Sequence, residues 1–231
     1  MTNSRSYYLK ELLAPLGDVE TSRDVVGEVR EIDVWFAPNP QATAEPQMLG
    51  LLGRLVSSPC LIEPFRNAVT PSQIRSCVSK LLDVHADWER QAKRQKTSLP
   101  EAELPRLWIL TPTVSVPILD GFRAMADEDN WMRGVYFLGD YWRTAVVAIH
   151  QLPATAETLW LRILGKGTVQ EQAIRELVTL SYNHPLRANT LLLLTNLQAN
   201  LQTRQNLDVE ERELIMELSP LVVQWRQAAL E

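Results

Sequence analysis

The sequence predicts a mixed α/β fold with a C-terminal helical extension. Over residues 1–153, segments in which apolar and polar residues alternate, as in strands, are interspersed with segments that repeat apolar residues every three or four positions, as in helices. Over residues 154–231 only the helical repeat continues. We therefore expect residues 1–153 to form a mixed sheet flanked by helices, and residues 154–231 to form helices that pack on this core.

The first 70 residues are expected to form a helix, two strands, a second helix and a buried strand. Apolar residues at helical spacing predict a helix over residues 6–16. Residues 19–25 and the alternating residues 28–38 are typical of two strands joined by a hairpin turn. A helix over residues 47–57 follows. The mostly apolar segment CLIEPF, residues 60–65, then indicates a buried central strand.

The clearest helix covers residues 70–96. Thr70 and Gln73 form a capping box, and Pro71 suits the first turn of a helix. Apolar residues then recur at spacings of three and four, which predicts one buried face. The residues of this face are Ile74, Cys77, Val78, Leu81, Leu82, His85 and Trp88.

Strands and a short helix alternate again up to residue 152. Residues 104–112 are β-like and apolar, and residues 114–127 favour a short helix. Two further strand candidates, within residues 132–139 and 141–152, flank the dipeptide Gly139–Asp140, which favours a hairpin.

The C-terminal extension is expected to contain three or four helices. Thr168 with Glu171, and Asp208 with Glu211, resemble helix-capping pairs. Pro220 should kink the last helix.

Composition excludes several classes of protein. The net charge of −5 and the pI near 5.4 exclude a wholly basic protein that coats nucleic acid, although a local basic groove remains compatible with them. The two cysteines, Cys60 and Cys77, lie in apolar patterns and are expected to be buried thiols. The N-terminal segment has no apolar signal-peptide core, and no apolar run is long enough to span a membrane. We therefore expect a cytoplasmic protein.

The best candidates for chemistry are two acidic residues in apolar strand segments, Asp33 and Glu63. A carboxylate in such a segment is costly to bury unless it has a partner. If both lie at the ends of adjacent strands, they would share a hard cation such as Mg²⁺ or Mn²⁺, which activates water for phosphodiester cleavage. The alternative is that Asp33 pairs with Arg23 or Arg30 and that Glu63 lies at a strand end.

These segments carry a resemblance to a known family. The order helix, strand, turn, strand with REIDVWF, then PCLIEPF, then a long helix resembles the core of the PD-(D/E)XK nuclease superfamily, whose fold is restriction-endonuclease-like. More narrowly, it resembles the Rpn-type recombination-promoting nucleases and related transposase-like proteins, together with uncharacterised cyanobacterial proteins. The segment VVAIHQLPATAETLWLRILGKGTVQEQAIREL resembles the stretch that follows the core in those proteins.

The resemblance implies metal-dependent cleavage of DNA. Asp33 matches the strand aspartate of the family, and Glu63 matches the glutamate of its E-x-K or E-x-Q triplet. The chain departs from the pattern at Phe65, where the family has lysine or glutamine. A basic group would then come from Arg66, if Pro64 bends the chain, or from Arg75 or Lys80 on the following helix. Glu20 or Glu28 would add a metal ligand.

Other motifs favour structural roles. Gly165–Thr168, with the sequence GKGT, resembles a phosphate loop but lacks the full spacing, and a helix end followed by a Thr168 cap is expected. The basic residues Arg90, Lys93, Arg94 and Lys96 are expected to be a solvated helix end, with contact to a phosphate backbone as the alternative. Trp131 and Trp142 are expected to be partly exposed.

Two functions are therefore expected. The first is a Mg²⁺- or Mn²⁺-dependent DNA endonuclease, with a site degenerate at Phe65, that uses Asp33, Glu63 and Arg66. The second is a non-catalytic scaffold that binds a protein partner or a second copy of itself through the C-terminal helices.

Overall fold

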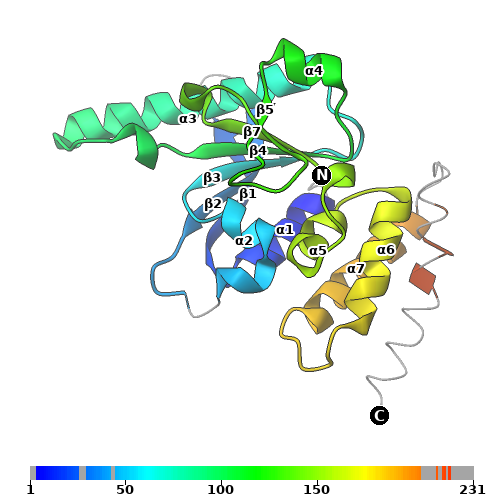
Figure 1. Ribbon diagram of the computed structural model, residues 1–231. Coiled ribbons are helices and arrows are strands. Elements are labelled where there is room, and N and C mark those ends of the chain that lie inside the picture. The colour runs from blue at the N-terminus through cyan, green and yellow to red at the C-terminus, as the bar shows by residue number, and fades with distance from the viewer. Residues whose placement is uncertain are drawn as a thin grey trace.

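The computed structural model describes residues 4–25, 30–42, 45–203, 212, 215–216 and 218–219. These residues contain a seven-stranded mixed sheet in the order β1-β2-β3-β4-β7-β6-β5, with helices on both faces (Figure 1). Neighbours β3, β4 and β7 are parallel, and the remaining pairs are antiparallel. The prediction of an α/β fold with a mixed sheet flanked by helices is confirmed.

The strands agree closely with the sequence pattern. They are β1 (Gly17–Val25), β2 (Arg30–Pro38), β3 (Cys60–Pro64), β4 (Arg106–Thr111), β5 (Met125–Ala126), β6 (Val135–Phe137) and β7 (Thr144–Ala148). The predicted central strand is β3, and all five of its residues are buried. The two-residue strand β5 was not predicted, because it is too short to show an alternating pattern.

The helices differ from the predictions mainly at their ends. They are α1 (Ser4–Leu13), α2 (Leu51–Leu55), α3 (Pro71–Gln95), α4 (Val116–Gly121), α5 (Leu159–Arg162), α6 (Gly167–Thr179) and α7 (Arg187–Gln202). The predicted helix over 47–57 is split at Gly50, whose positive φ of 53° separates a 3-10 turn from α2. The Thr168 cap was wrong, because Lys166 is the N-cap residue of α6.

Two predictions about the C-terminal region, the Asp208–Glu211 cap and the kink at Pro220, lie outside the described residues. In the part of the chain that is described, no helix has both the length and the apolar character needed to cross a membrane.

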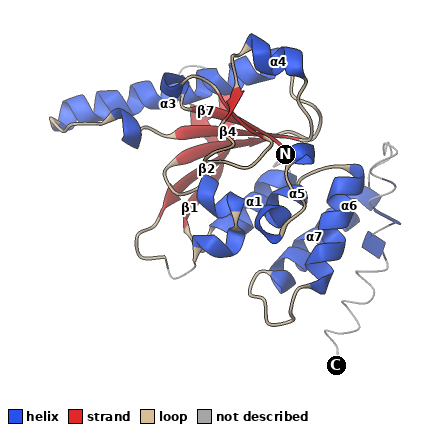
Figure 2. Ribbon diagram, in the orientation of Figure 1, coloured by secondary structure: helices blue, strands red, loops and turns tan. Residues whose placement is uncertain are grey.

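The two faces of the sheet carry separate hydrophobic clusters. Helices α3 and α4 cover one face, whereas α1, α2 and α5 cover the other (Figure 2). Because neighbouring strand residues point to opposite faces, Leu61 packs with Cys77 and Leu81 of α3, and Ile62 packs in the cluster on the other face. Each face of β3 therefore has its own apolar partner.

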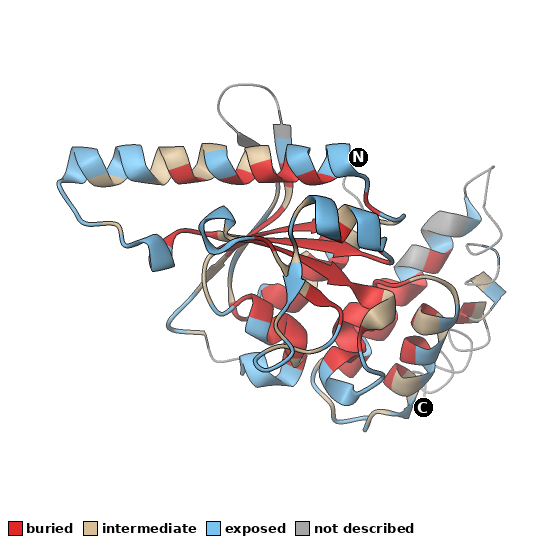
Figure 3. Ribbon diagram, turned by 45° about the horizontal axis from the view of Figure 1, so that its top comes forward, coloured by how far each residue is buried: buried red, intermediate tan, exposed pale blue. Residues whose placement is uncertain are grey.

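Helix α3 packs on the sheet along one narrow stripe. Its sheet-facing side is buried, whereas its outer side and its last two turns are largely exposed (Figure 3). The capping box of Thr70 and Gln73 is present as predicted. Leu82, which was expected on the buried face, is 43% exposed, so the contacting stripe is narrower than the apolar pattern.

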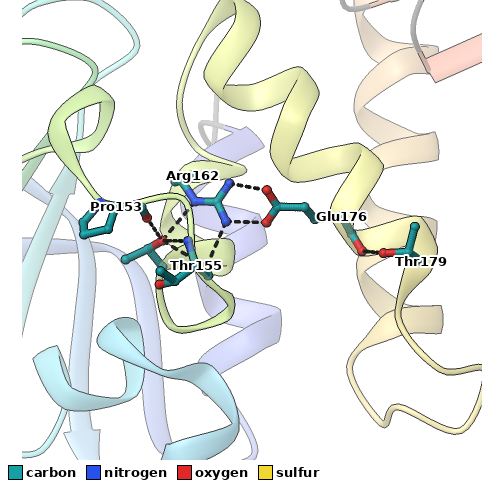
Figure 4. Close-up of polar contacts among 6 residues, drawn as sticks. Pro153, Thr155, Arg162, Glu176 and Thr179 are labelled. Carbon is teal, nitrogen blue, oxygen red and sulfur yellow. Dashed lines mark hydrogen bonds and ion pairs between the residues drawn. The ribbon is translucent and has the colours of Figure 1, made fainter.

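The start of the C-terminal extension packs on the face of the sheet that α1 covers. Residues of α1, α2, α5, α6 and α7 share one hydrophobic cluster. Within it, the buried guanidinium of Arg162 on α5 donates to both carboxylate oxygens of Glu176 on α6 (Figure 4). It also donates to Thr158 Oγ1 at 3.0 Å and to the carbonyl oxygen of Thr155 at 2.8 Å. These bonds fix α6 to α5.

Candidate active site at the β2–β3 pair

The register of β2 and β3 brings the two predicted acidic residues together. These strands are antiparallel, with Val34 opposite Ile62. The next position along the same register places Asp33 opposite Glu63. Side chains at directly opposite positions of an antiparallel pair lie on the same face, with Cβ atoms about 4.5–5.5 Å apart. The two carboxyl groups are thus neighbours on the face that α3 covers.

A lysine from α3 completes this group. Lys80 Nζ lies 3.0 Å from Oε1 and 2.9 Å from Oε2 of Glu63. The side chains of Lys80 and Glu63 are 13% and 2% exposed. Lys80 reaches the carboxylate because Leu81, beside it on α3, packs with Leu61, which shares a strand face with Glu63. Arg75, the other basic candidate on this helix, is exposed.

Phe65 and Arg66 take different roles from those of the sequence pattern. Phe65 follows β3 directly, donates its backbone N–H to Leu110 at 2.7 Å and packs against the α3-side cluster. Arg66 lies close enough to Arg5 of α1 for its charge to add to the effect of burial, which lowers the pKa of Arg5. The amine that contacts Glu63 comes from Lys80, and a catalytic role for Arg66 stays a prediction.

Burial and neighbouring charges change the pKa of both carboxyl groups. Burial raises the pKa of Glu63 from its ordinary value of 4.5 to about 7; the charge of Lys80 opposes this shift, and that of Asp33 adds to it. Burial also raises the pKa of Asp33, again opposed by Lys80. A carboxyl group with a pKa near 7 exchanges its proton at neutral pH, and such groups concentrate at functional sites.

The raised pKa of Glu63 predicts a pH-dependent stability. Because the folded-state pKa is above the unfolded value, protonation of Glu63 stabilises the fold at low pH, and this contribution is lost as the pH rises through about 7. The quantity to follow is the free energy of unfolding of the parent minus that of Glu63→Gln. We expect this difference to fall by about 1–3 kcal/mol between pH 5 and pH 7, and then to stay level. Urea unfolding from pH 5 to 8.5 measures it. A difference that rises with pH would contradict a raised pKa.

The carboxylates of Asp33 and Glu63 suit a hard divalent cation, although they would supply only a few of its ligands. Mg²⁺ is commonly bound by one or two carboxylates and several waters, which Asp33 and Glu63 would supply in part. Within the described ranges, no cluster of three or more His, Cys, Asp or Glu side chains forms a metal site. Glu20 is exposed and opposite Trp35 rather than Asp33, and Glu28 lies outside the described residues. A cation at Glu63 would have to displace Lys80.

One neighbour of the site was expected only as a core residue. Cys77 is buried, and burial raises its pKa, with smaller electrostatic effects from Glu63, Lys80 and Asp33. Its position three residues before Lys80 on α3 shows that this lysine borders the apolar face. That spacing is the sequence signal that favours Lys80 over Arg66.

The other candidates lie away from the acidic pair or in structural positions. His85 is buried, with Nε2 2.9 Å from the carbonyl oxygen of Pro105. Trp142 is 50% exposed and Trp131 is partly buried, as predicted. The alternative pairing of Asp33 with Arg23 or Arg30 falls on side chains outside the described ones. A cavity of about 490 Å³ is lined by residues such as Leu16 and Phe36 of the α1-side cluster.

Comparisons with protein-family models, with curated proteins and with solved structures found no match to this chain.

Proposed function

We propose that this protein is a divalent-metal-dependent DNA endonuclease with a restriction-endonuclease-like core of the PD-(D/E)XK type. One observation carries the proposal: Lys80 Nζ contacts both carboxylate oxygens of Glu63, which lies across the β2–β3 pair from Asp33. Two carboxylates and one amine are thereby collected at one point. The amine that Phe65 cannot supply comes instead from α3.

Each side chain has a distinct role in this proposal. Asp33 and Glu63 would hold Mg²⁺ or Mn²⁺. A bound cation supplies an activated water and stabilises negative charge on a phosphate. Lys80, which is already within hydrogen-bond distance of Glu63, would orient water beside the carboxylates and stabilise charge that develops on the phosphate oxygens. Phe65 contributes packing alone.

Metal binding and plasmid nicking test this proposal together. We expect Mn²⁺ titration calorimetry to detect binding to the parent, and Asp33→Asn to weaken it by about tenfold or more, because the variant removes one charged ligand. The parent should also nick supercoiled plasmid with Mg²⁺ or Mn²⁺ and not with EDTA. Equal nicking by Asp33→Asn, prepared in the same way, would identify a contaminating nuclease and contradict the proposal.

A second candidate is a non-catalytic scaffold in which Glu63 and Lys80 form a structural ion pair. It is favoured by the 2% exposure of the Glu63 side chain and by the contact of Lys80 with both of its oxygens. Exposed apolar side chains in the C-terminal part, namely Tyr182, Leu192 and Met216, would then face a protein partner or a second copy. The variants of Lys80 described below separate the two candidates.

A further inference from the structure

The cavity of about 490 Å³ lies where the end of β2 and the loop after it meet helix α2. Its volume is within the usual range of pockets that hold small molecules. Leu16, Phe36 and Val56 line it, and all three are buried members of the hydrophobic cluster on the face of the sheet that α1 and α2 cover. The acidic pair Asp33 and Glu63 is on the other face. The cavity is therefore a separate place where an apolar group can be bound.

The rim of this cavity is polar and carries one positive charge. The side chains of Asn39, Gln47, Arg54 and Ser57 line it and are exposed, and Arg54 is the single charged residue in the lining. Within the described part of the chain, no carboxylate forms an ion pair with Arg54, and the side chains of Gln47 and Ser57 form no hydrogen bond. A ligand at this rim would thus meet a guanidinium group that has no anionic partner of its own.

Aromatic packing holds Arg54 in place at the rim. Its Cζ atom lies 3.8 Å from the centroid of the Trp131 ring. That ring is fixed in turn by Trp108 and Phe137, whose ring centroids are 5.5 Å and 5.2 Å away. A guanidinium stacked on an aromatic face keeps its N–H groups at its edge, where they can bind a planar oxyanion. A side chain that is already ordered loses less entropy when a ligand binds.

We propose that this cavity binds a small monocarboxylic acid with an apolar body. The carboxylate pairs with Arg54 at the rim, and the apolar body lies against Leu16, Phe36 and Val56. One guanidinium fork matches one carboxylate in charge and in geometry. A phosphate monoester would bring up to two negative charges to a single cation, and a neutral apolar molecule would leave that cation without a partner. This binding goes beyond the proposed function and does not depend on DNA cleavage.

Titration calorimetry on the full-length protein near neutral pH tests the inference with octanoate as the probe. We expect saturable binding at one site. Hexanoate, which is two methylenes shorter, should bind about tenfold more weakly, because each methylene removed from water adds to affinity. Octan-1-ol has the same chain without the charge and should also bind at least about tenfold more weakly, because it lacks the charge-assisted hydrogen bonds to Arg54.

Three variants assign the binding to this cavity. Arg54→Gln should raise the Kd of octanoate at least about tenfold and leave that of octan-1-ol within about twofold, because the removed group contacts only the carboxylate. The matched control Arg94→Gln removes an exposed arginine from the end of α3 and should leave both Kd values unchanged. Ser57→Phe narrows the exposed rim and should weaken both ligands. Each variant is checked for parental thermal unfolding.

Several outcomes would overturn the inference. They are the absence of saturable octanoate binding by the parent, equal Kd values for octanoate and octan-1-ol, and an unchanged Kd for octanoate in Arg54→Gln. Equal losses in Arg54→Gln and Arg94→Gln would show a response to total charge and would overturn it as well. Unchanged binding of both ligands by Ser57→Phe would place the site elsewhere in the molecule and contradict the assignment to this cavity.

Discussion

Replacing Lys80 with methionine is expected to lower the single-turnover rate of Mg²⁺-dependent DNA cleavage by about 10²–10³-fold. Removal of one preorganised donor from a site that stabilises developing charge costs about that much. Metal affinity should stay equal or increase, because Lys80 Nζ occupies the oxygens of Glu63 that a cation needs. Cleavage of supercoiled plasmid at saturating Mg²⁺, with Mn²⁺ calorimetry on the same samples, measures both quantities.

Two further variants control the Lys80 experiment. Lys93→Met removes a lysine from the exposed end of the same helix and should cleave at the parental rate. Lys80→Arg keeps the positive charge but supplies a group that stays protonated, so it should restore part of the rate. Parental rates for Lys80→Met would show that the amine has no part in cleavage.

Variants of Lys80 and Glu63 also distinguish an active site from a structural ion pair. Lys80→Met leaves the buried carboxylate of Glu63 without its positively charged partner, which destabilises the fold. The double variant Glu63→Gln/Lys80→Met removes both charges and should recover much of that stability. If the pair is catalytic, the double variant stays inactive although it is well folded. If the parent neither cleaves DNA nor binds metal and the double variant is as stable as the parent, the scaffold is the correct interpretation.

Arg162→Met is expected to lower the free energy of unfolding by about 2–4 kcal/mol. The Arg162 side chain is 2% exposed and donates to Glu176, Thr158 and the carbonyl oxygen of Thr155 (Figure 4). Methionine fills similar space but leaves these acceptors without their donor, and an unpaired buried group costs far more than a surface one. Glu176 is 33% exposed and regains some hydration, which keeps the loss below the largest values for buried pairs.

Urea unfolding measures this loss against a matched arginine. Arg175→Met removes an arginine that is 62% exposed and pairs with Glu171 at 3.7 Å, so its expected effect is below about 0.5 kcal/mol. The melting temperature of Arg162→Met should fall by roughly 5–15 °C for a chain of this size. Equal losses for the two variants would show that burial does not strengthen the Arg162 network.

Much of the fold followed from local patterns. The alternation of REIDVWF, the apolar segment CLIEPF and the capping box at Thr70 predicted β2, β3 and the start of α3. The helix over 47–57 was overestimated, because its periodicity does not show that Gly50 adopts a positive φ. The prediction of a Thr168 cap was wrong because α6 begins at Gly167, with Lys166 as its N-cap residue in a loop that is held by tertiary contacts.

Patterns in the sequence predicted most of the strands and helices, and they identified the two carboxylates that lie in apolar strands. Both follow from side-chain periodicity and from the cost of burying charge, which are local properties. The position of Asp33 opposite Glu63, and the supply of the amine by Lys80, 17 residues beyond Glu63, could be seen in the folded structure alone. Strand register and the rotation of α3 on the sheet result from the packing of many side chains at once, so no single segment encodes them.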